Sequence, residues 1–421
     1  MRGKTMVDRT GEEVFIKFLG GAEKVGSLGM LLETWGVRLL FDYGLTPTNP
    51  PEYPLPAPRV DRVFLTHAHV DHSGMIPWLC GHKDAIVHTI PPTIDVSILL
   101  AEDSNKICGY EGYPQPYDVH DIRMAERNFR PLRFGQAKQI GDVVVIPRPA
   151  GHIPGAAMYE IHAEEKMLFT GDINTTTTQL VWGTKPVHCD ILFMESTYAG
   201  REHEPRAKVE YEFLSKIEEV VDRGGKAIVP AFAVGRTQEI MLLLRGRGYD
   251  VWLDGMGKTI NKIYFGYGEY IRDLKKLLKA KDEVQVVRNP KGRKKALKGE
   301  VIITTSGMLD GGPVLHYLEA VKDDPKSAIL LTGYQVEGTN GRRLMDTGTV
   351  EIDGVVEKLR AEVAFFDLSA HAGHSELVRF ARDTGAHTIV LMHGDNRETL
   401  AEDLSDFADV YLPRDGEVLK L

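Results

Sequence analysis

Seven short hydrophobic runs in this sequence each lead to a His, Asp or Glu residue. Short apolar runs bounded by turn residues are typical of buried strands, so these seven side chains are predicted to follow strand ends. Strand ends that gather at one edge of a sheet are the usual position of a functional site. The seven residues are Asp42, His67, His152, Asp172, Glu195, His371 and His393.

The second of these runs opens the stretch THAHVDHSG at residues 66–74. Such packing of imidazoles and carboxylates is costly unless a cation neutralises it. His67 and His69 are two residues apart, so in extended backbone they share a side. Asp71 and His72 then turn away, and a helix is predicted to begin at Ser73 and Gly74. We therefore expect one half of it to bind one metal ion and the other half a second.

Ligand counting leads to a site for two zinc ions, because zinc prefers neutral imidazole and carboxylate ligands. The residues expected to bind the first ion are His67, His69 and His152, and those expected to bind the second are Asp71, His72 and His393. Asp172 is expected to bridge the two ions, and Asp42 to orient a ligating histidine through its other ring nitrogen. Manganese accepts the same ligands and is the alternative.

Two such metals suit the hydrolysis of phosphodiesters, in which a hydroxide between the ions attacks phosphorus in line. The leaving oxygen needs a proton that neither metal supplies, and His371 is the candidate acid. Glu195 is expected to hold His371 charged and oriented. Asp71 is counted both as a metal ligand and, with these two residues, as catalytic. The alternative is that His371 only caps or packs near the site.

The order of the expected elements suggests two domains. The first half is rich in short strands, whereas strand and helix alternate from about residue 205, which is typical of a parallel α/β domain. The runs that lead to His371 and His393 return from about residue 360. The predicted domains are therefore 1–204, an inserted domain at 205–358, and a segment at 359–421 that completes the first domain.

The net charge of −9 counts against non-specific nucleic-acid binding, so any attraction to phosphates has to be local. The dense basic stretch at 291–298 is a candidate contact to a nucleic-acid backbone, or else a solvated loop.

Three separated cysteines support neither a disulfide framework nor a cysteine-ligated zinc site. No run approaches the ~18–20 apolar residues of a membrane span, and residues 1–10 lack the apolar core of a secretory signal. We therefore expect a cytoplasmic protein without membrane association.

These motifs resemble the metallo-β-lactamase fold, and more narrowly its β-CASP nuclease branch. The residues that match the general motifs are His67-x-His69-x-Asp71-His72, Asp42, His152 and Asp172, and those that match the β-CASP motifs are Glu195, His371 and His393. The stretches at 230–239 and 305–312 are also similar to this family. The sequence Ser-Ala-His-Ala at 369–372 is more similar to the nuclease-subunit group of the cleavage and polyadenylation specificity factor than to RNase J, the nearest alternative.

The resemblance implies an αββα sandwich with an inserted parallel α/β β-CASP domain. It also implies a zinc-dependent ribonuclease that cleaves single-stranded RNA as an endonuclease, a 5′–3′ exonuclease or both, and a possible homodimer. Two other readings stay open: a catalytically inactive RNA-binding subunit, which would lack ligands that are all present here, and a small-molecule metallohydrolase, against which the inserted domain argues.

Five further residues receive roles from this resemblance and from their positions. Arg236 opens a predicted helix and is a candidate phosphate contact, although a helix-start or interdomain salt bridge is an equal alternative. The loop with Ser306 and Gly307 is a candidate to bind phosphate through backbone N–H groups, and the alternative is a glycine turn without a ligand. Ser369 is expected to contact substrate. Asp395, next to His393, is expected to support that ligand.

Overall fold

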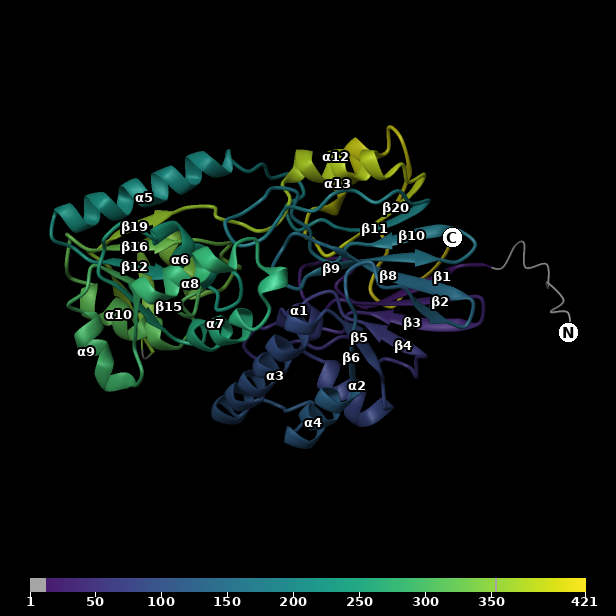
Figure 1. Cartoon of the computed structure of the whole chain (residues 1–421), viewed down its shortest axis with the longest axis horizontal. Coiled ribbons are helices and arrows are strands. Elements are labelled where there is room, and N and C mark those ends of the chain that lie inside the picture. Colours follow the sequence, from purple (N-terminus) through teal and green to yellow (C-terminus); the bar gives the residue numbers. More distant parts are fainter. Residues whose placement is uncertain (1–12, 353) are drawn as a thin grey trace, which may run out of the picture. The chain divides into compact units, whose positions relative to one another are not determined.

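The computed structural model describes residues 13–352 and 354–421, which divide into two compact units (Figure 1). The first unit contains the described residues up to Thr175, together with Gly183–Glu202 and His371–Leu421. The second contains Thr176–Trp182 and the described part of 203–370. Each unit is described by itself below.

Two seven-stranded sheets form the first unit. In order across the first sheet, the strands are β22 (Val418–Lys420), β1 (Phe15–Gly20), β2 (Gly29–Thr34), β3 (Val37–Phe41), β4 (Arg62–Phe64), β5 (Val87–Thr89) and β6 (Phe129–Pro131). In order across the second sheet, they are β21 (Asp409–Tyr411), β20 (Thr388–Met392), β11 (Ile191–Glu195), β10 (Lys166–Phe169), β9 (Ala157–His162), β8 (Val143–Pro149) and β7 (Lys138–Ile140).

Helices lie on the outer sides of these sheets, so the first unit is the expected αββα sandwich (Figure 1). The helices beside the first sheet are α1 (Val70–Ser73), α2 (Ile76–Lys83), α3 (Pro91–Glu111) and α4 (Val119–Asn128), and those beside the second are α12 (His374–Thr384) and α13 (Arg397–Leu404). Between the sheets, the rings of Phe41 and Phe169 lie 5.1 Å apart and those of Phe64 and Tyr159 lie 5.3 Å apart. Burial of these large apolar rings stabilises the contact of the two sheets.

Parallel pairing explains why the site forms at one edge of each sheet. Strands β3 and β4 are parallel neighbours, and so are β10, β11 and β20. Their carboxyl ends therefore point the same way within each sheet. The residues at or directly beyond these ends include Asp42, His67, Asp172, Glu195 and His393.

The second unit contains a six-stranded sheet in which all neighbouring strands are parallel, as expected for this segment. In order across the sheet, the strands are β14 (Val284–Val286), β13 (Val251–Asp254), β15 (Val301–Thr304), β12 (Ala227–Pro230), β16 (Ala328–Leu331) and β19 (Glu362–Phe365). The main helices are α5 (Arg206–Asp222), α6 (Arg236–Leu244), α7 (Gly257–Phe265), α8 (Leu274–Glu283), α9 (Arg293–Ala296), α10 (Pro313–Val321) and α11 (Asn340–Thr347). The remaining elements are the 3₁₀ turns η1 (Gly268–Tyr270) and η2 (Pro290–Gly292) and the hairpin β17 (Thr349–Ile352) and β18 (Val355–Lys358).

The structure differs from the sequence-based expectations in the boundary between the domains. Strand β19 was expected in the final segment of the first domain, but it pairs with β16 and lies in the second unit, so the first unit resumes at His371. The reason is that the partner of a strand depends on tertiary pairing, which a local apolar pattern does not reveal. The first half also contains a long helix, α3, of 21 residues.

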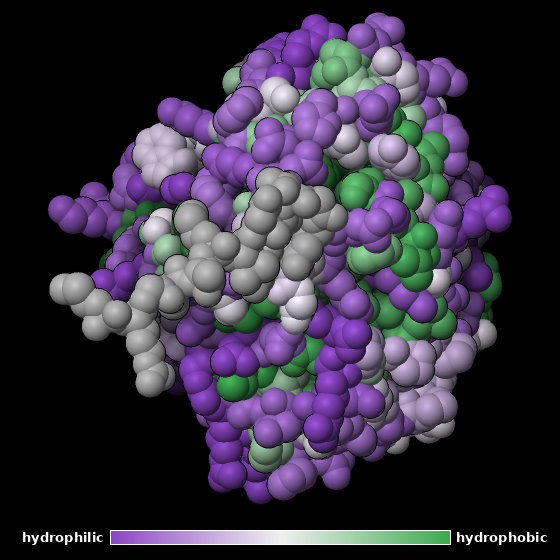
Figure 2. Space-filling model, turned by 90° about the vertical axis from the view of Figure 1, so that its right-hand side faces the viewer, coloured by the Kyte–Doolittle hydropathy of each residue, from purple (hydrophilic) through white to green (hydrophobic). Residues whose placement is uncertain are grey.

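Among the described residues, no helix combines the length and the apolar character needed to span a membrane. Hydrophilic residues cover most of the face shown in Figure 2, and hydrophobic residues form smaller groups between them.

Candidate metal centre

The short helix α1, which follows β4, is held against neighbouring backbone. The N–H of Tyr43 donates to the carbonyl of His72 at 2.8 Å, and that of Leu28 donates to the carbonyl of Asp71 at 2.8 Å. A Cβ at Gly44 would lie 1.7 Å from the carbonyl oxygen of Asp71, so only glycine permits this approach. These contacts fix the backbone from which two expected ligands extend.

Two site residues adopt left-handed backbone conformations. The φ angles of Asp42 and His393 are 57° and 54°, values that residues other than glycine seldom adopt. Such strain persists where the surrounding structure holds it, and it concentrates at functional sites.

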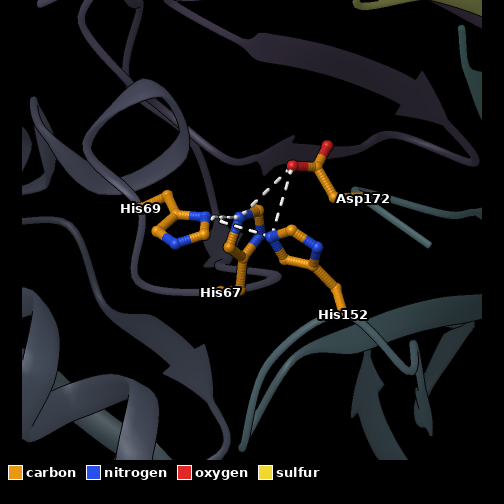
Figure 3. A group of neighbouring side chains, drawn as sticks. All are labelled: His67, His69, His152 and Asp172. Carbon is orange, nitrogen blue, oxygen red and sulfur yellow. Dashed lines mark hydrogen bonds and ion pairs between the residues drawn. The ribbon is translucent and has the colours of Figure 1, made fainter. Parts of the chain in front are cut away.

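The first three expected ligands converge on a common point (Figure 3). Nδ1 of His69 lies 3.1 Å from Nε2 of His67 and 3.1 Å from Nε2 of His152. Oδ2 of Asp172 lies 3.5 Å from Nε2 of His67 and 3.8 Å from Nε2 of His152. Ligands 2.0–2.1 Å from a tetrahedral ion are about 3.3 Å from one another, so these spacings suit one ion.

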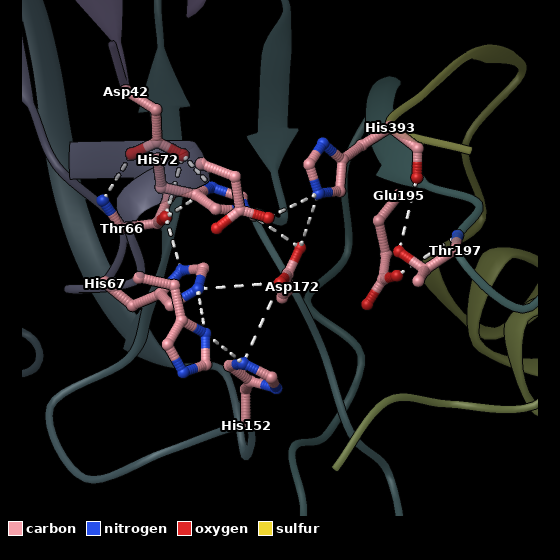
Figure 4. A network of polar contacts seen from close by, with 12 residues as sticks. Asp42, Thr66, His67, His72, His152, Asp172, Glu195, Thr197 and His393 are labelled. Atoms are coloured by element: carbon pink, nitrogen blue, oxygen red, sulfur yellow. Dashed lines mark hydrogen bonds and ion pairs between the residues drawn. The ribbon is translucent and has the colours of Figure 1, made fainter. Parts of the chain in front are cut away.

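The second group meets the other oxygen of the same carboxylate (Figure 4). Oδ1 of Asp172 lies 3.3 Å from Nε2 of His72 and 3.8 Å from Nε2 of His393. Oδ2 of Asp71 lies 3.5 Å from Nε2 of His393 and 4.0 Å from Nε2 of His72. Asp172 therefore directs one oxygen to each group.

Unpaired buried atoms are the strongest sign that the second group fits a cation. Within the described part of the chain, Nε2 of His72, Nε2 of His393 and Oδ1 of Asp172 are buried without a hydrogen-bond partner. Leaving such atoms unpaired costs about 1–3 kcal/mol each. All three lie together, and a divalent cation between them would compensate that cost.

The electrostatics of the cluster also favour the binding of a cation. Burial lowers the pKa of His67 well below its usual value and also lowers that of His69, so both are neutral and suited to bind a metal. Burial opposes charge on His72, but the carboxylates of Asp172, Asp71 and Asp42 raise its pKa well above the usual value. The carboxylates thus favour positive charge at this position, which a metal ion would supply.

Asp42 lies behind the ligands and holds one of them. Its Oδ2 is 2.8 Å from Nδ1 of His72, an arrangement that leaves Nε2 directed into the cluster. Its carboxylate also accepts the N–H of Thr66 at 2.7 Å and the hydroxyl of Thr66 at 2.8 Å. The same hydroxyl is 3.0 Å from Nδ1 of His67.

Glu195 and His371 form a pair beside the two metal groups. Nδ1 of His371 lies 3.2 Å from Oε1 of Glu195, and Nε2 lies 3.9 Å from Oδ2 of Asp172. Glu195 is fully buried and accepts the N–H of Ile173 at 2.7 Å. Burial alone would lower the pKa of His371, but the charges of Glu195 and then Asp172 outweigh it and raise the pKa to about 9. The two carboxylates therefore favour the protonated form of His371.

The structure brings most expected site residues together but not all of them. Asp395 is exposed, and among the described residues no hydrogen bond or ion pair joins it to His393, so the support expected from Asp395 is not seen. The four expected substrate residues belong to the second unit: Arg236 begins α6, Ser306 and Gly307 follow β15, and Ser369 follows β19. Their roles remain predictions.

Thr66 was not assigned a role from the sequence. The available signal was its position directly before His67, as a polar residue in a loop that follows the buried strand β4. Tyr198 was also missed; its ring stacks against that of His371 with centroids 5.8 Å apart. An aromatic residue three positions after Glu195 gives no local sign of such a contact.

Three family models match the chain. Residues 25–231 match the metallo-beta-lactamase superfamily, residues 237–344 the Beta-Casp domain, and residues 356–413 a Zn-dependent metallo-hydrolase RNA specificity domain. Together they cover most of both units.

The chain is also similar to named archaeal proteins along its whole length. It is 35% identical to "Probable RNase MJ4" of Methanocaldococcus jannaschii, over 96% of this chain and 100% of that protein. It is 32% identical to "RNase aCSPSF2" of Saccharolobus solfataricus, over 97% of this chain and 85% of that protein. A solved structure of a protein of unknown function from Enterococcus faecalis shares the fold, with a TM-score of 0.62 and 14% identity over 97% of this chain and 100% of that one.

Proposed function

Because the chain belongs to the β-CASP branch of the metallo-β-lactamase superfamily, we propose that it is a zinc-dependent ribonuclease that hydrolyses phosphodiester bonds of single-stranded RNA. The names of two relatives, both called RNases, and the match to a zinc-dependent RNA specificity domain support zinc and RNA. We also propose the cytoplasm as its location, since the relatives named RNases come from archaea, whose cells have no nucleus. The homodimer stays a prediction.

The observation that carries the proposal is the position of Asp172 between two groups of ligands. His67, His69 and His152 would hold one ion and Asp71, His72 and His393 the other. Two divalent ions bound in this way supply Lewis acidity that activates water and offsets charge on the phosphate oxygens.

The protein's own acid completes the reaction. Protonated His371 would donate the proton on Nε2 to the leaving oxygen, since Nδ1 is engaged by Glu195 at 3.2 Å. Glu195 is itself positioned by the N–H groups of Ile173 and Thr197, at 2.7 and 3.3 Å. Hydrogen bonding from the backbone thus keeps the carboxylate in the orientation that holds the imidazole.

The proposal is tested by incubating the purified protein with labelled linear and circular single-stranded RNA and, separately, a chromogenic lactam. Cleavage of circular RNA would establish internal cutting, and strict dependence on a 5′-monophosphate end would establish 5′–3′ exonuclease action. The variant His67→Ala should abolish RNA cleavage, whether the wild type acts as an endonuclease or as a 5′–3′ exonuclease. Intact RNA together with a hydrolysed lactam would contradict the proposal.

A further inference from the structure

A basic segment of the second unit contrasts with the rest of the chain. Residues 257–298 contain thirteen Lys or Arg against four Asp or Glu, a net charge of +9, whereas the whole chain has −9. The segment forms α7, η1, α8, β14, η2 and α9, and β14 is the edge strand of the sheet. Local positive charge of this kind attracts a phosphate backbone even when the net charge is negative.

An exposed tryptophan lies beside this segment. The side chain of Trp182 is 63% exposed, the largest exposed fraction of a tryptophan in the described residues. The guanidinium of Arg272, within the basic segment, lies 4.8 Å from the centre of its ring. Indole and guanidinium surfaces are the ones on which unpaired bases stack without regard to sequence.

The backbone holds this pair in place. The N–H of Arg272 donates to the carbonyl of Leu180 at 2.9 Å, and its guanidinium donates to the carbonyl of Thr178 at 2.6 Å. The buried carboxylate of Glu239 in α6 accepts the N–H of Leu180 at 2.9 Å. The segment that ends at Trp182 is therefore fixed to the second unit, and a base that stacks there finds a preformed surface.

Further rings alternate with positive charges along the same segment. The rings of Tyr267 and Tyr270 have centroids 6.4 Å apart, shortly before Arg272 in the chain. The ammonium of Lys281 lies 5.9 Å from the ring of Phe265. Alternation of aromatic and basic side chains is typical of grooves that bind single-stranded nucleic acid.

We propose that Trp182, Arg272 and the exposed lysines of α8 form a binding platform for single-stranded RNA. A base stacks on the indole of Trp182, while Lys275, Lys276 and Lys279 interact with neighbouring phosphates. Since stacking needs an unpaired base, the platform prefers single strands to duplexes and has little sequence preference. This inference depends on the proposed function in one respect, namely that RNA is the natural ligand.

The test is a binding measurement with the metal-loaded protein and a fluorescent, phosphorothioate-linked oligouridine, followed by fluorescence anisotropy. Trp182→Ala and Arg272→Ala should each weaken binding on the order of tenfold, and Trp182→Phe should retain most of the affinity because it keeps a ring. Affinity should fall steeply with salt, and the slope should become shallower in Lys275→Gln.

The matched control is Tyr211→Ala. Tyr211 is 72% exposed on α5 of the same unit, between Glu210 and Glu212, and should bind RNA as the wild type does. Unchanged affinity in Trp182→Ala, or an equal loss in Tyr211→Ala, would overturn the platform. Hydrolysis of a small phosphodiester by the unmodified protein tests the proposed function separately, because such a substrate has no neighbouring bases to stack.

Discussion

The carboxylate of Glu195 lies 3.2 Å from Nδ1 of His371, on the side of the ring opposite the nitrogen that faces Asp172. One imidazole thus lies between a buried acid and the carboxylate of Asp172 in the candidate metal centre. This arrangement fixes the ring and favours its charged form, which is the form required of a general acid.

Glu195→Gln should move the alkaline limit of the pH–rate profile to lower pH. Burial lowers the pKa of His371, and the charge of Glu195 is the main cause that raises it to about 9. Activity that depends on protonated His371 is present below this pKa and lost above it. Without the charge of Glu195 the loss should begin at least about one pH unit lower, a shift measurable by RNA cleavage across pH 6–10.

The control for this prediction is metal content. Elemental analysis of Glu195→Gln should match the wild type, because Glu195 is not among the proposed ligands of either ion. An alkaline limit identical to that of the wild type would mean that His371 is not the group that titrates.

Asp172→Asn should lose metal and activity together. Its two oxygens face separate ligand groups, at 3.5 Å from His67 and 3.3 Å from His72, so removal of its charge weakens both sites. We expect bound zinc to fall well below two per chain and cleavage to fall by at least about a thousandfold. Asp406→Asn, an exposed change in the same unit, should leave both unchanged. Full metal content in Asp172→Asn would exclude the bridging role.

Thr66→Val should weaken the site without altering a proposed ligand. The hydroxyl of Thr66 is 2.8 Å from Asp42 and 3.0 Å from Nδ1 of His67, and valine leaves both buried atoms with one partner fewer. We expect a loss of about 1–3 kcal/mol in stability and a fall of about tenfold in zinc affinity. Thermal unfolding and competition with a chromogenic chelator measure these quantities. Thr66→Ser keeps the hydroxyl and should behave as the wild type does; equal losses in both variants would show that packing, not the hydroxyl, is responsible.

His88 should make the protein less stable in mild acid. Burial, with the positive charges of Lys138 and Arg62, lowers its pKa to about 4, whereas an unfolded histidine titrates near about 6.5. Between these values the unfolded chain binds a proton that the folded chain does not, so stability is lost as pH falls.

The variant His88→Phe keeps a ring against Phe64, whose centroid is 5.4 Å from that of His88, but cannot titrate. Its Tm should therefore fall less steeply than that of the wild type between pH 6.5 and pH 4, in differential scanning calorimetry. His120→Phe, a change at an exposed histidine, should retain the wild-type slope. Parallel slopes for wild type and His88→Phe would contradict the assignment.

The sequence was sufficient to predict the convergence of the ligands because each follows a short apolar strand. Parallel pairing places the ends of β3 and β4 at one edge of the first sheet and those of β10, β11 and β20 at one edge of the second. Strand β8, which leads to His152, runs antiparallel to β9 and therefore in the same direction as β10, so it ends at the same edge. The sandwich and the inserted α/β domain followed from the same patterns and from the family resemblance.

Other features depend on tertiary contacts that no local pattern reveals. Strand β9 was missed because Glu160 interrupts its apolar run, yet Glu160 is buried and paired with Arg148 and Lys166. Asp395 is two residues from His393, but the chain turns at His393, where φ is 54°, and Asp395 is left exposed. Proximity in the sequence therefore did not predict a contact between the side chains of Asp395 and His393.

Crystals grown with zinc and measured on both sides of the zinc absorption edge would test the two-metal site most directly. We predict two anomalous peaks about 3.5–4 Å apart, one contacted by His67, His69 and His152 and the other by Asp71, His72 and His393, with Asp172 touching both. A single peak, or two peaks of which Asp172 touches neither, would contradict the account.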